Sequence, residues 1–246
     1  MKKTEENSLF PDLELERKTN VAQVKAKERR EARKNKNFGI EYCTGAKFCG
    51  KYGIPQIKAY KGDLPERFIT FSEVTERGGT SVGVVCCDFD YELECLWDNP
   101  GNYVLTLAGY KCFAEPDFSI RVGDPKSVQI ANTYRNHAVA YFMQEHGVNV
   151  MPAPSWSSTT SYEYCFDGYE RGGAVLVSTV GVLKDERSLM YFRIGFSEML
   201  KRLSPDCVIL YGDVNDDVLR FLPSQLDVHF VSHERYNRMR GNEGER

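Results

Sequence analysis

Residues 82–90 read VGVVCCDFD, an apolar run that ends in polar and acidic residues, and the pattern recurs five more times along the chain. The other runs are KCFAEPDFS (111–119), VNVMPAPSW (148–156), AVLVSTVG (174–181), CVILYGD (207–213) and DVHFVSH (227–233). Segments of helical length or pattern separate them. Short apolar strands that alternate with helices are typical of βα units and predict a mainly parallel sheet.

Two long helices are predicted between these strands. The first covers residues 126–146, where Ile130, Tyr134, Ala138 and Tyr141 recur at helical spacing on one face. The second covers residues 188–203. With six or more βα units, we expect an α/β fold and favour an incomplete or distorted β/α barrel over an open doubly wound sheet. The reason is that every unit keeps the same order, with no reversal point.

The chain divides into three predicted parts. Residues 1–37 form a basic, exposed arm, residues 38–235 a single α/β domain, and residues 236–246 a frayed polar tail. Residues 17–37 carry nine Lys or Arg against two Glu, a net charge of +7, so the rest of the chain sums to −10 within the total of −3. The arm is either a solvated helix that binds nothing or a weak, non-specific contact for nucleic acid.

Composition indicates an ordinary globular protein, with 41% hydrophobic and 27% charged residues. The amino-terminal residues MKKTEENSLF lack the apolar core of a signal peptide, and no stretch has the length of a membrane span. We therefore expect a cytoplasmic protein without membrane contact. The eight cysteines include no CxxC pair, so no metal site and no cofactor can be assigned from spacing.

Candidate site residues follow from the fold, because the carboxyl ends of parallel strands meet at one edge of a sheet or barrel. The predicted catalytic or metal-binding carboxylates are Asp88, Asp117 and Asp213. The predicted ligand-binding residues are Ser119, Arg135, Trp156, Ser178, Thr179, Tyr211 and His233. His137 and His146, on the first long helix, are expected at the surface or at the helix end.

These residue types suit several kinds of chemistry. Clustered carboxylates bind divalent cations or separate into an acid and a base. Arg135 would clamp an anion, and Trp156 would stack on a sugar or base. Each feature also has an ordinary structural explanation, since Asp and Ser after a strand commonly cap helices and form turns.

The segments EPDFSI (115–120), QIANTYRNHAVAYFMQEHGVNVMPAPSW (129–156), VSTVG (177–181) and SPDCVILYG (204–212) resemble a bacterial and phage family of unknown function. That family is common on mobile genetic elements of Gram-positive bacteria. The matching positions are Pro116, Asp117, Phe118, Ser119, Tyr134, Arg135, Gly147, Pro152, Trp156, Ser178, Thr179, Gly181, Tyr211 and Gly212. The resemblance implies a phage or mobile-element setting and supplies no activity.

Two functions remain open on this basis. The chain is either a hydrolase or transferase acting on a phosphate- or sugar-containing substrate at the strand ends, or a non-catalytic accessory factor of a mobile element. In the second case it would bind nucleic acid or a host protein. No GxxxxGK[ST], GxGxxG, GxSxG or HExxH motif is present to choose a reaction.

Overall fold

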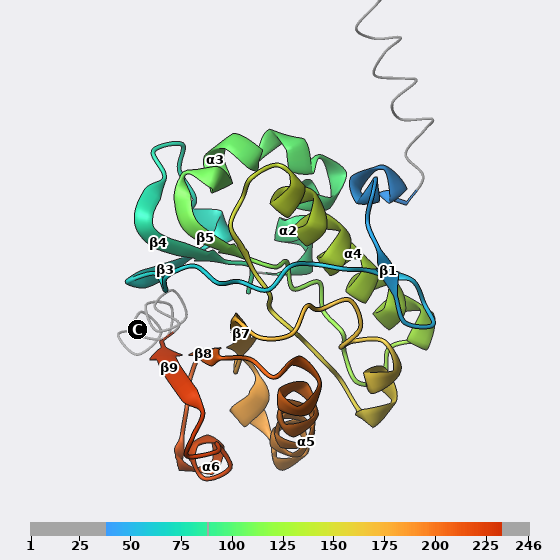
Figure 1. Ribbon diagram of the computed structural model, residues 1–246. Coiled ribbons are helices and arrows are strands. Elements are labelled where there is room, and N and C mark those ends of the chain that lie inside the picture. The colour runs from blue at the N-terminus through green and yellow to red at the C-terminus, as the bar shows by residue number, and fades with distance from the viewer. Residues whose placement is uncertain (1–37, 88, 233–246) are drawn as a thin grey trace, which may run out of the picture. The chain divides into compact units, whose positions relative to one another are not determined.

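Two parallel sheets carry the fold in the computed structural model, which describes residues 38–87 and 89–232 (Figure 1). The first sheet has the order β3-β4-β5-β6 and the second the order β7-β8-β9, and every pairing within them is parallel. A separate antiparallel pair joins β1 and β2. The strands are β1 (Phe48–Cys49), β2 (Ile54–Pro55), β3 (Arg67–Thr70), β4 (Gly79–Val85), β5 (Tyr110–Ala114), β6 (Val150–Met151), β7 (Ala174–Ser178), β8 (Cys207–Tyr211) and β9 (Asp227–Val231).

The expected α/β class and its parallel strands are confirmed. Within each sheet the strands follow chain order, without a reversal point. One backbone bond links the sheets, from the N–H of Leu176 in β7 to the carbonyl of Pro152 just after β6 (2.9 Å). Among the described residues, however, no ladder joins β9 to β3, so the strands do not close into a barrel.

Helices lie along the outer faces of both sheets (Figure 1). The first sheet is accompanied by α2, α3 and α4, and the second by α5 and α6. The α-helices are α2 (Asp90–Asp98), α3 (Val104–Ala108), α4 (Lys126–Glu145), α5 (Glu186–Leu203) and α6 (Asp216–Leu219). The 3-10 helices are η1 (Ile40–Cys43), η2 (Phe71–Glu73), η3 (Pro100–Asn102), η4 (Thr159–Glu163) and η5 (Val182–Lys184).

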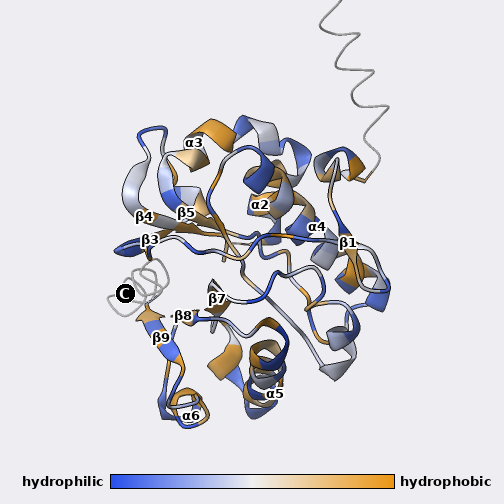
Figure 2. Ribbon diagram, in the orientation of Figure 1, coloured by the Kyte–Doolittle hydropathy of each residue, from blue (hydrophilic) through white to orange (hydrophobic). Residues whose placement is uncertain are grey.

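Alternating side chains of the strands feed three apolar clusters. In β7, Val175 and Val177 face α5, whereas Ala174 and Leu176 join a cluster formed by the inner faces of the two sheets. Both faces of β7 are therefore buried, which explains why its run is continuously apolar. Figure 2 shows the central strands in the hydrophobic colours and many helical positions in the hydrophilic ones.

The two long helices lie where their sequences predict. In α5, the Asp185 side chain accepts a hydrogen bond from the N–H of Ser188 (2.7 Å) and so caps the first turn. At the other end, Ser204 adopts a left-handed conformation (φ 46°) that stops the helix before Pro205.

The expectation that His137 lies at the surface is wrong, since this side chain is fully buried. α4 packs against β2 as well as against the first sheet, so it is buried on more than one face. The ring nitrogen Nδ1 of His137 lies 2.9 Å from the carbonyl oxygen of Pro55 in β2. None of the helices in the described ranges combines the length and apolar character required to cross a bilayer.

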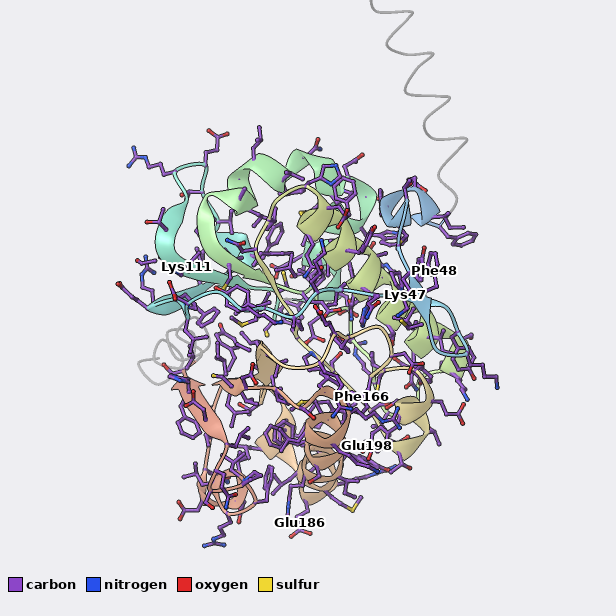
Figure 3. All side chains as sticks on the ribbon, in the orientation of Figure 1. Lys47, Phe48, Lys111, Phe166, Glu186 and Glu198 are labelled. Atoms are coloured by element: carbon purple, nitrogen blue, oxygen red, sulfur yellow. The ribbon has the colours of Figure 1, made fainter. Side chains whose placement is uncertain are left out.

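Trp156 packs directly on the backbone of α5. Its indole N–H donates to the carbonyl of Tyr191 (3.1 Å), and its ring stacks on Phe192 at 5.7 Å between centroids. Phe166, which Figure 3 labels beside α5, lies at the same centroid distance from the indole. A Cβ atom on Gly195 would lie only 2.0 Å from the indole nitrogen, so the helix must have glycine at this contact.

Gly195→Ala should therefore destabilise the protein even though alanine favours a helix. The substitution gains about 1 kcal/mol in helix propensity. Displacing a packed indole ring should outweigh this gain and leave a net loss of about 1–3 kcal/mol in the free energy of unfolding. Denaturant unfolding measures the change, and a shifted tryptophan emission should accompany it.

Gly101→Ala is the matched control, because the nearest atom to its added Cβ is Phe142 Cζ at 3.9 Å. Its unfolding free energy should stay within about 0.5 kcal/mol of the parent value. Equal stability of Gly195→Ala and the parent chain would contradict the proposed close contact.

Candidate functional site

A pocket of about 390 Å³ opens at the carboxyl ends of β4, β5, β6 and β7. Residues just after each strand line it, among them Cys87 after β4, Asp117 after β5, Ser155 after β6 and Val180 after β7. The inner-face cluster fills the space between the sheets with side chains such as Met151. The strand ends are thus where the parallel strands leave room for a ligand.

Asp117 is the partly buried carboxyl group of this pocket. Burial raises its pKa to about 6, the carboxylate of Asp90 acts in the same direction, and a hydrogen bond with the Ser155 side chain opposes them. The group therefore changes its protonation state close to neutral pH, where an acid–base residue works best.

Glu115 is a second carboxyl group of the lining, and only 1% of the residue is exposed. Its Oε2 accepts hydrogen bonds from the N–H of Ala153 and the hydroxyl of Tyr169, both at 2.9 Å. Burial, with a smaller contribution from the carboxylate of Asp117, raises the pKa of Glu115 to about 8 despite these two bonds. The side chain is therefore protonated at neutral pH.

The other oxygen of Glu115 faces His137. Oε1 lies 3.6 Å from Nε2 of His137, and neither atom has a hydrogen-bond partner in the structure. Because Nδ1 lies against the Pro55 carbonyl, it carries the ring proton and leaves Nε2 as the acceptor. Burial lowers the pKa of His137 to about 3, so a neutral acid and a neutral imidazole lie side by side.

The pocket is lined by basic side chains as well as by carboxyl groups. Arg121 and Lys184 belong to its lining and add two cations. Arg121 pairs with Asp90 (Nη2 to Oδ2, 3.2 Å), and the same carboxylate accepts from the hydroxyl of Ser119 at 2.8 Å. Asp90 is the first residue of α2, so these contacts tie Arg121 and Ser119 to the start of that helix.

Another part of the pocket wall is aromatic. Trp156, Tyr191 and Phe192 line it, and the contacts of Trp156 with α5 hold its ring in place. Ser155 and Ser157 add hydroxyl groups next to this wall. The pocket thus combines carboxyl groups, a cationic rim and flat apolar surface.

Four of the predicted site residues line the pocket together: Asp117, Ser119, Trp156 and Ser178. Thr179 and Tyr211 are buried beside each other outside the lining. The Thr179 N–H donates to the Tyr211 carbonyl (2.8 Å), so their contact joins the ends of β7 and β8.

Two further predicted residues lie elsewhere. Asp213 is exposed and is not part of the lining. Arg135 pairs with Glu94 (2.6 Å) and lies over the ring of Phe118 (3.7 Å to its centroid), also outside the lining. Asp88 and His233 fall outside the described residues, as does the basic arm of residues 1–37.

Sequence reasoning missed Glu115 and His137. Glu115 stands two residues before Asp117 in the run KCFAEPDFS, directly after the last residue of β5. An acidic residue directly attached to an apolar strand was a usable signal. For His137 the sequence offers only a position near a helical apolar stripe, and the packing of β2 decides its burial.

Comparison with known proteins gives relatives from two phages. The chain is 29% identical over 125 residues to the Gene 1 protein of Mycobacterium phage L5, covering 51% of this chain and 55% of that protein. It is 28% identical over 123 residues to the Gene 1 protein of Mycobacterium phage D29, covering 50% and 46%. The chain thus spans about half the length of these curated relatives. No solved structure matches it.

A family model covers most of the chain. Residues 46–228 match the family described as Domain of unknown function (DUF4417). This range contains the nine strands of residues 38–87 and 89–232 except the last three residues of β9, and it includes the described lining of the pocket. The chain therefore belongs to the DUF4417 family, whose relatives here are phage proteins.

Proposed function

We propose that the strand-end pocket is the active site of a hydrolase or transferase, and that Asp117 is its acid–base group. The observation that carries this proposal is a pair of carboxyl groups in one pocket with pKa values of about 6 and about 8. A carboxyl group that titrates near neutral pH suits general acid–base chemistry, and its protonated neighbour Glu115 leaves Asp117 as the group that gains and loses the proton.

The two carboxyl groups have different roles in this proposal. Asp117 ionises first and accepts a proton from the attacking group. Glu115 keeps its proton in the same pH range, so it adds no negative charge that would oppose the ionisation of Asp117. The Ala153 N–H and the Tyr169 hydroxyl hold Glu115 in place, which makes it a positioning residue rather than one that touches substrate.

The lining favours a small anionic substrate with a flat ring. A pocket of about 390 Å³ holds one small molecule. Arg121 and Lys184 at the rim attract a phosphate or other anion, and Trp156 offers a face for a sugar or a base. A small compound that contains both a phosphate and a sugar or base, such as a nucleotide or a sugar phosphate, fits the size, the charge and the stacking surface of the pocket.

The phage relatives supply a setting and no reaction. We place this activity in the biology of a phage or another mobile element. Weak nucleic-acid binding through residues 1–37 remains a prediction from their charge of +7 between residues 17 and 37.

Asp117→Asn should abolish turnover while the protein stays folded. A panel of nucleotides, sugar phosphates and glycosides is incubated with the full chain, and mass spectrometry of the small molecules identifies the compound consumed. Loss of the acid–base group should slow that reaction by about 10²–10⁴-fold. The unfolding free energy should change by no more than about 1–2 kcal/mol, because a partly buried carboxyl group of a pocket adds little to the fold.

Asp213→Asn is the control, since this carboxylate also follows a strand but is exposed outside the pocket. Its turnover should equal that of the parent. The proposal would be overturned if no compound of the panel is consumed and none shifts the thermal transition of the protein. An Asp117→Asn variant that retains full turnover would also overturn it.

Glu115→Gln should change how stability depends on pH. The pKa of Glu115 is raised in the folded state, from 4.5 to about 8, so its contribution to stability is lost as pH rises towards 8. His137 has a lowered pKa, so its effect on the pH dependence of stability has the opposite sign, and it acts only below pH 6.5. The loss of stability caused by the raised pKa of Asp117 is complete by about pH 6. The window for Glu115 is therefore pH 6.5 to 8.

Across this window the parent should lose about 1–2 kcal/mol of unfolding free energy, at about 1.4 kcal/mol per pH unit for one proton. Glutamine mimics the protonated acid, so Glu115→Gln should show a flatter profile and be the more stable protein at pH 8. Chemical denaturation at several pH values measures this. Glu66→Gln, at an exposed position, should keep the parent profile. If the unfolding free energies of Glu115→Gln and the parent changed with pH in parallel, Glu115 would be ionised in the folded protein throughout pH 6.5 to 8.

A further inference from the structure

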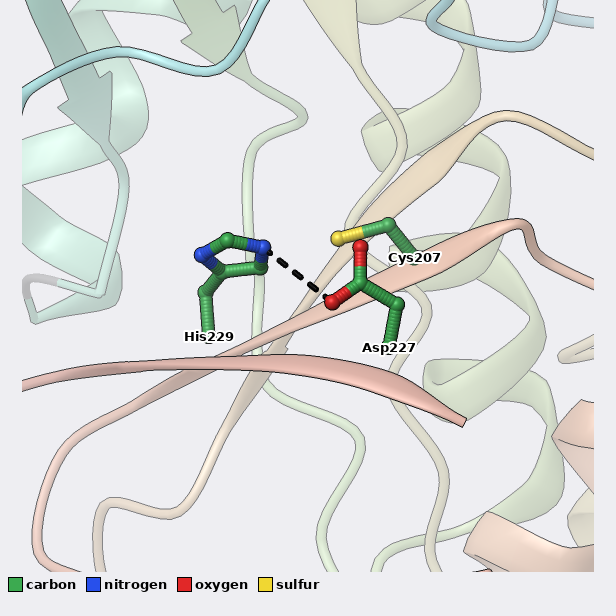
Figure 4. Close-up of side chains that lie close together, drawn as sticks. All are labelled: Cys207, Asp227 and His229. Atoms are coloured by element: carbon green, nitrogen blue, oxygen red, sulfur yellow. Dashed lines mark ion pairs between the residues drawn. The ribbon is translucent and has the colours of Figure 1, made fainter. Parts of the chain in front are cut away.

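Cys207, Asp227 and His229 form a cluster at the amino-terminal ends of β8 and β9 (Figure 4). Cys207 is the first residue of β8 and Asp227 the first of β9, and the two are direct partners in the parallel register. Because the pocket lies at the carboxyl ends of the strands, this cluster lies towards the opposite end of the fold and is independent of the proposed active site.

The register brings the three side chains together. Asp227 and His229 are two residues apart on one strand, so their side chains project from the same face. Cys207 projects from the neighbouring strand beside Asp227. Twenty residues separate Cys207 from Asp227 in the sequence, which is why no metal-binding spacing is visible there.

The distances suit a small tetrahedral ion. The ligand atoms of the three side chains lie within 4.8 Å of one another. Nε2 of His229 and Oδ1 of Asp227 are 3.4 Å apart, as the dashed line in Figure 4 marks. Two ligands at about 2.1 Å from a tetrahedral zinc ion are themselves separated by about 3.4 Å. This pair already has the spacing that zinc requires.

The ligand types select among metals. Thiolate and imidazole favour zinc and other transition metals, whereas magnesium and calcium prefer oxygen ligands throughout. We propose that Cys207, Asp227 and His229 bind one Zn²⁺ ion, with water as its fourth ligand.

The burial of the three residues agrees with such a site. Cys207 is 8% exposed, while the side chains of Asp227 and His229 are 64% and 50% exposed, so an ion would have a protein side and an open side. Three protein ligands and an accessible fourth position are typical of zinc sites that keep a bound water.

Zinc binding changes the state of the thiol. Without a metal, burial and the Asp227 carboxylate, which accepts a hydrogen bond from the thiol, together raise the pKa of Cys207 to about 11. On binding, the S–H bond breaks, the proton passes to solvent, and the sulfur electron pair forms the bond to zinc. The ion would then connect β9 to β8 through side chains as well as through the backbone ladder.

Metal titration of the full chain tests the proposal. Reduced, chelator-treated protein without a histidine tag is titrated with Zn²⁺ in competition with a chromophoric chelator. Native mass spectrometry gives the stoichiometry. We expect one equivalent of Zn²⁺ per chain, and with Co²⁺ a sulfur-to-cobalt charge-transfer band. Loss of a direct ligand should weaken binding by more than the roughly 10–100-fold that loss of an outer partner costs.

Three variants and one control locate the site. Cys207→Ser should abolish the charge-transfer band, and Asp227→Asn and His229→Gln should each weaken zinc binding. Cys49→Ser, which changes a partly buried thiol outside the cluster, should bind like the parent. The exposed His229→Gln variant decides the test if Cys207→Ser disturbs the core. A parent chain that binds no stoichiometric zinc, or a His229→Gln variant that binds it with parent affinity, overturns the proposal.

Discussion

The packing of the two sheets through their inner faces is the constraint on which the rest of the structure depends. Side chains from β3 to β8, among them Val85, Ala114, Leu176 and Ile209, fill the space between the sheets. The outer faces are covered by helices, so each central strand is apolar on both sides. The candidate sites therefore lie at the ends of the strands. The pocket is at the carboxyl ends, and the cluster of Cys207, Asp227 and His229 is at the amino-terminal ends.

This constraint explains how much the sequence predicted. A strand that is buried on both faces must be continuously apolar, which made runs such as those of β7 and β8 recognisable, and the two long helices followed from their periodicity. Whether the strands close into a barrel was harder to predict from the sequence. Pairing between the first and last strands depends on sheet twist and register, which no local sequence pattern encodes. The edges of β3 and β9 remain unpaired with each other among the described residues.

The candidate site was predicted in part for a related reason. Knowing that Asp117, Ser119 and Trp156 follow strands and that Ser178 ends one was enough to expect them near one edge. Arg135 shows where such reasoning ends. Its guanidinium group lies on Phe118 and pairs with Glu94, two contacts that depend on how α2 and α4 pack. Burial of Glu115 and His137, and with it their raised and lowered pKa values, likewise depends on packing from distant segments.

The seat of Trp156 on α5 has a consequence for motion. The indole packs against Gly195 and donates a hydrogen bond to the helix backbone, so this wall of the pocket moves together with α5. A ligand that pushes the indole outward must move or rotate the helix, whose Phe196 and Met199 are locked in the outer core of the second sheet. The aromatic wall is therefore a rigid part of the pocket. The loops that carry Arg121 and Val180 are the parts that can move to fit ligands of different size.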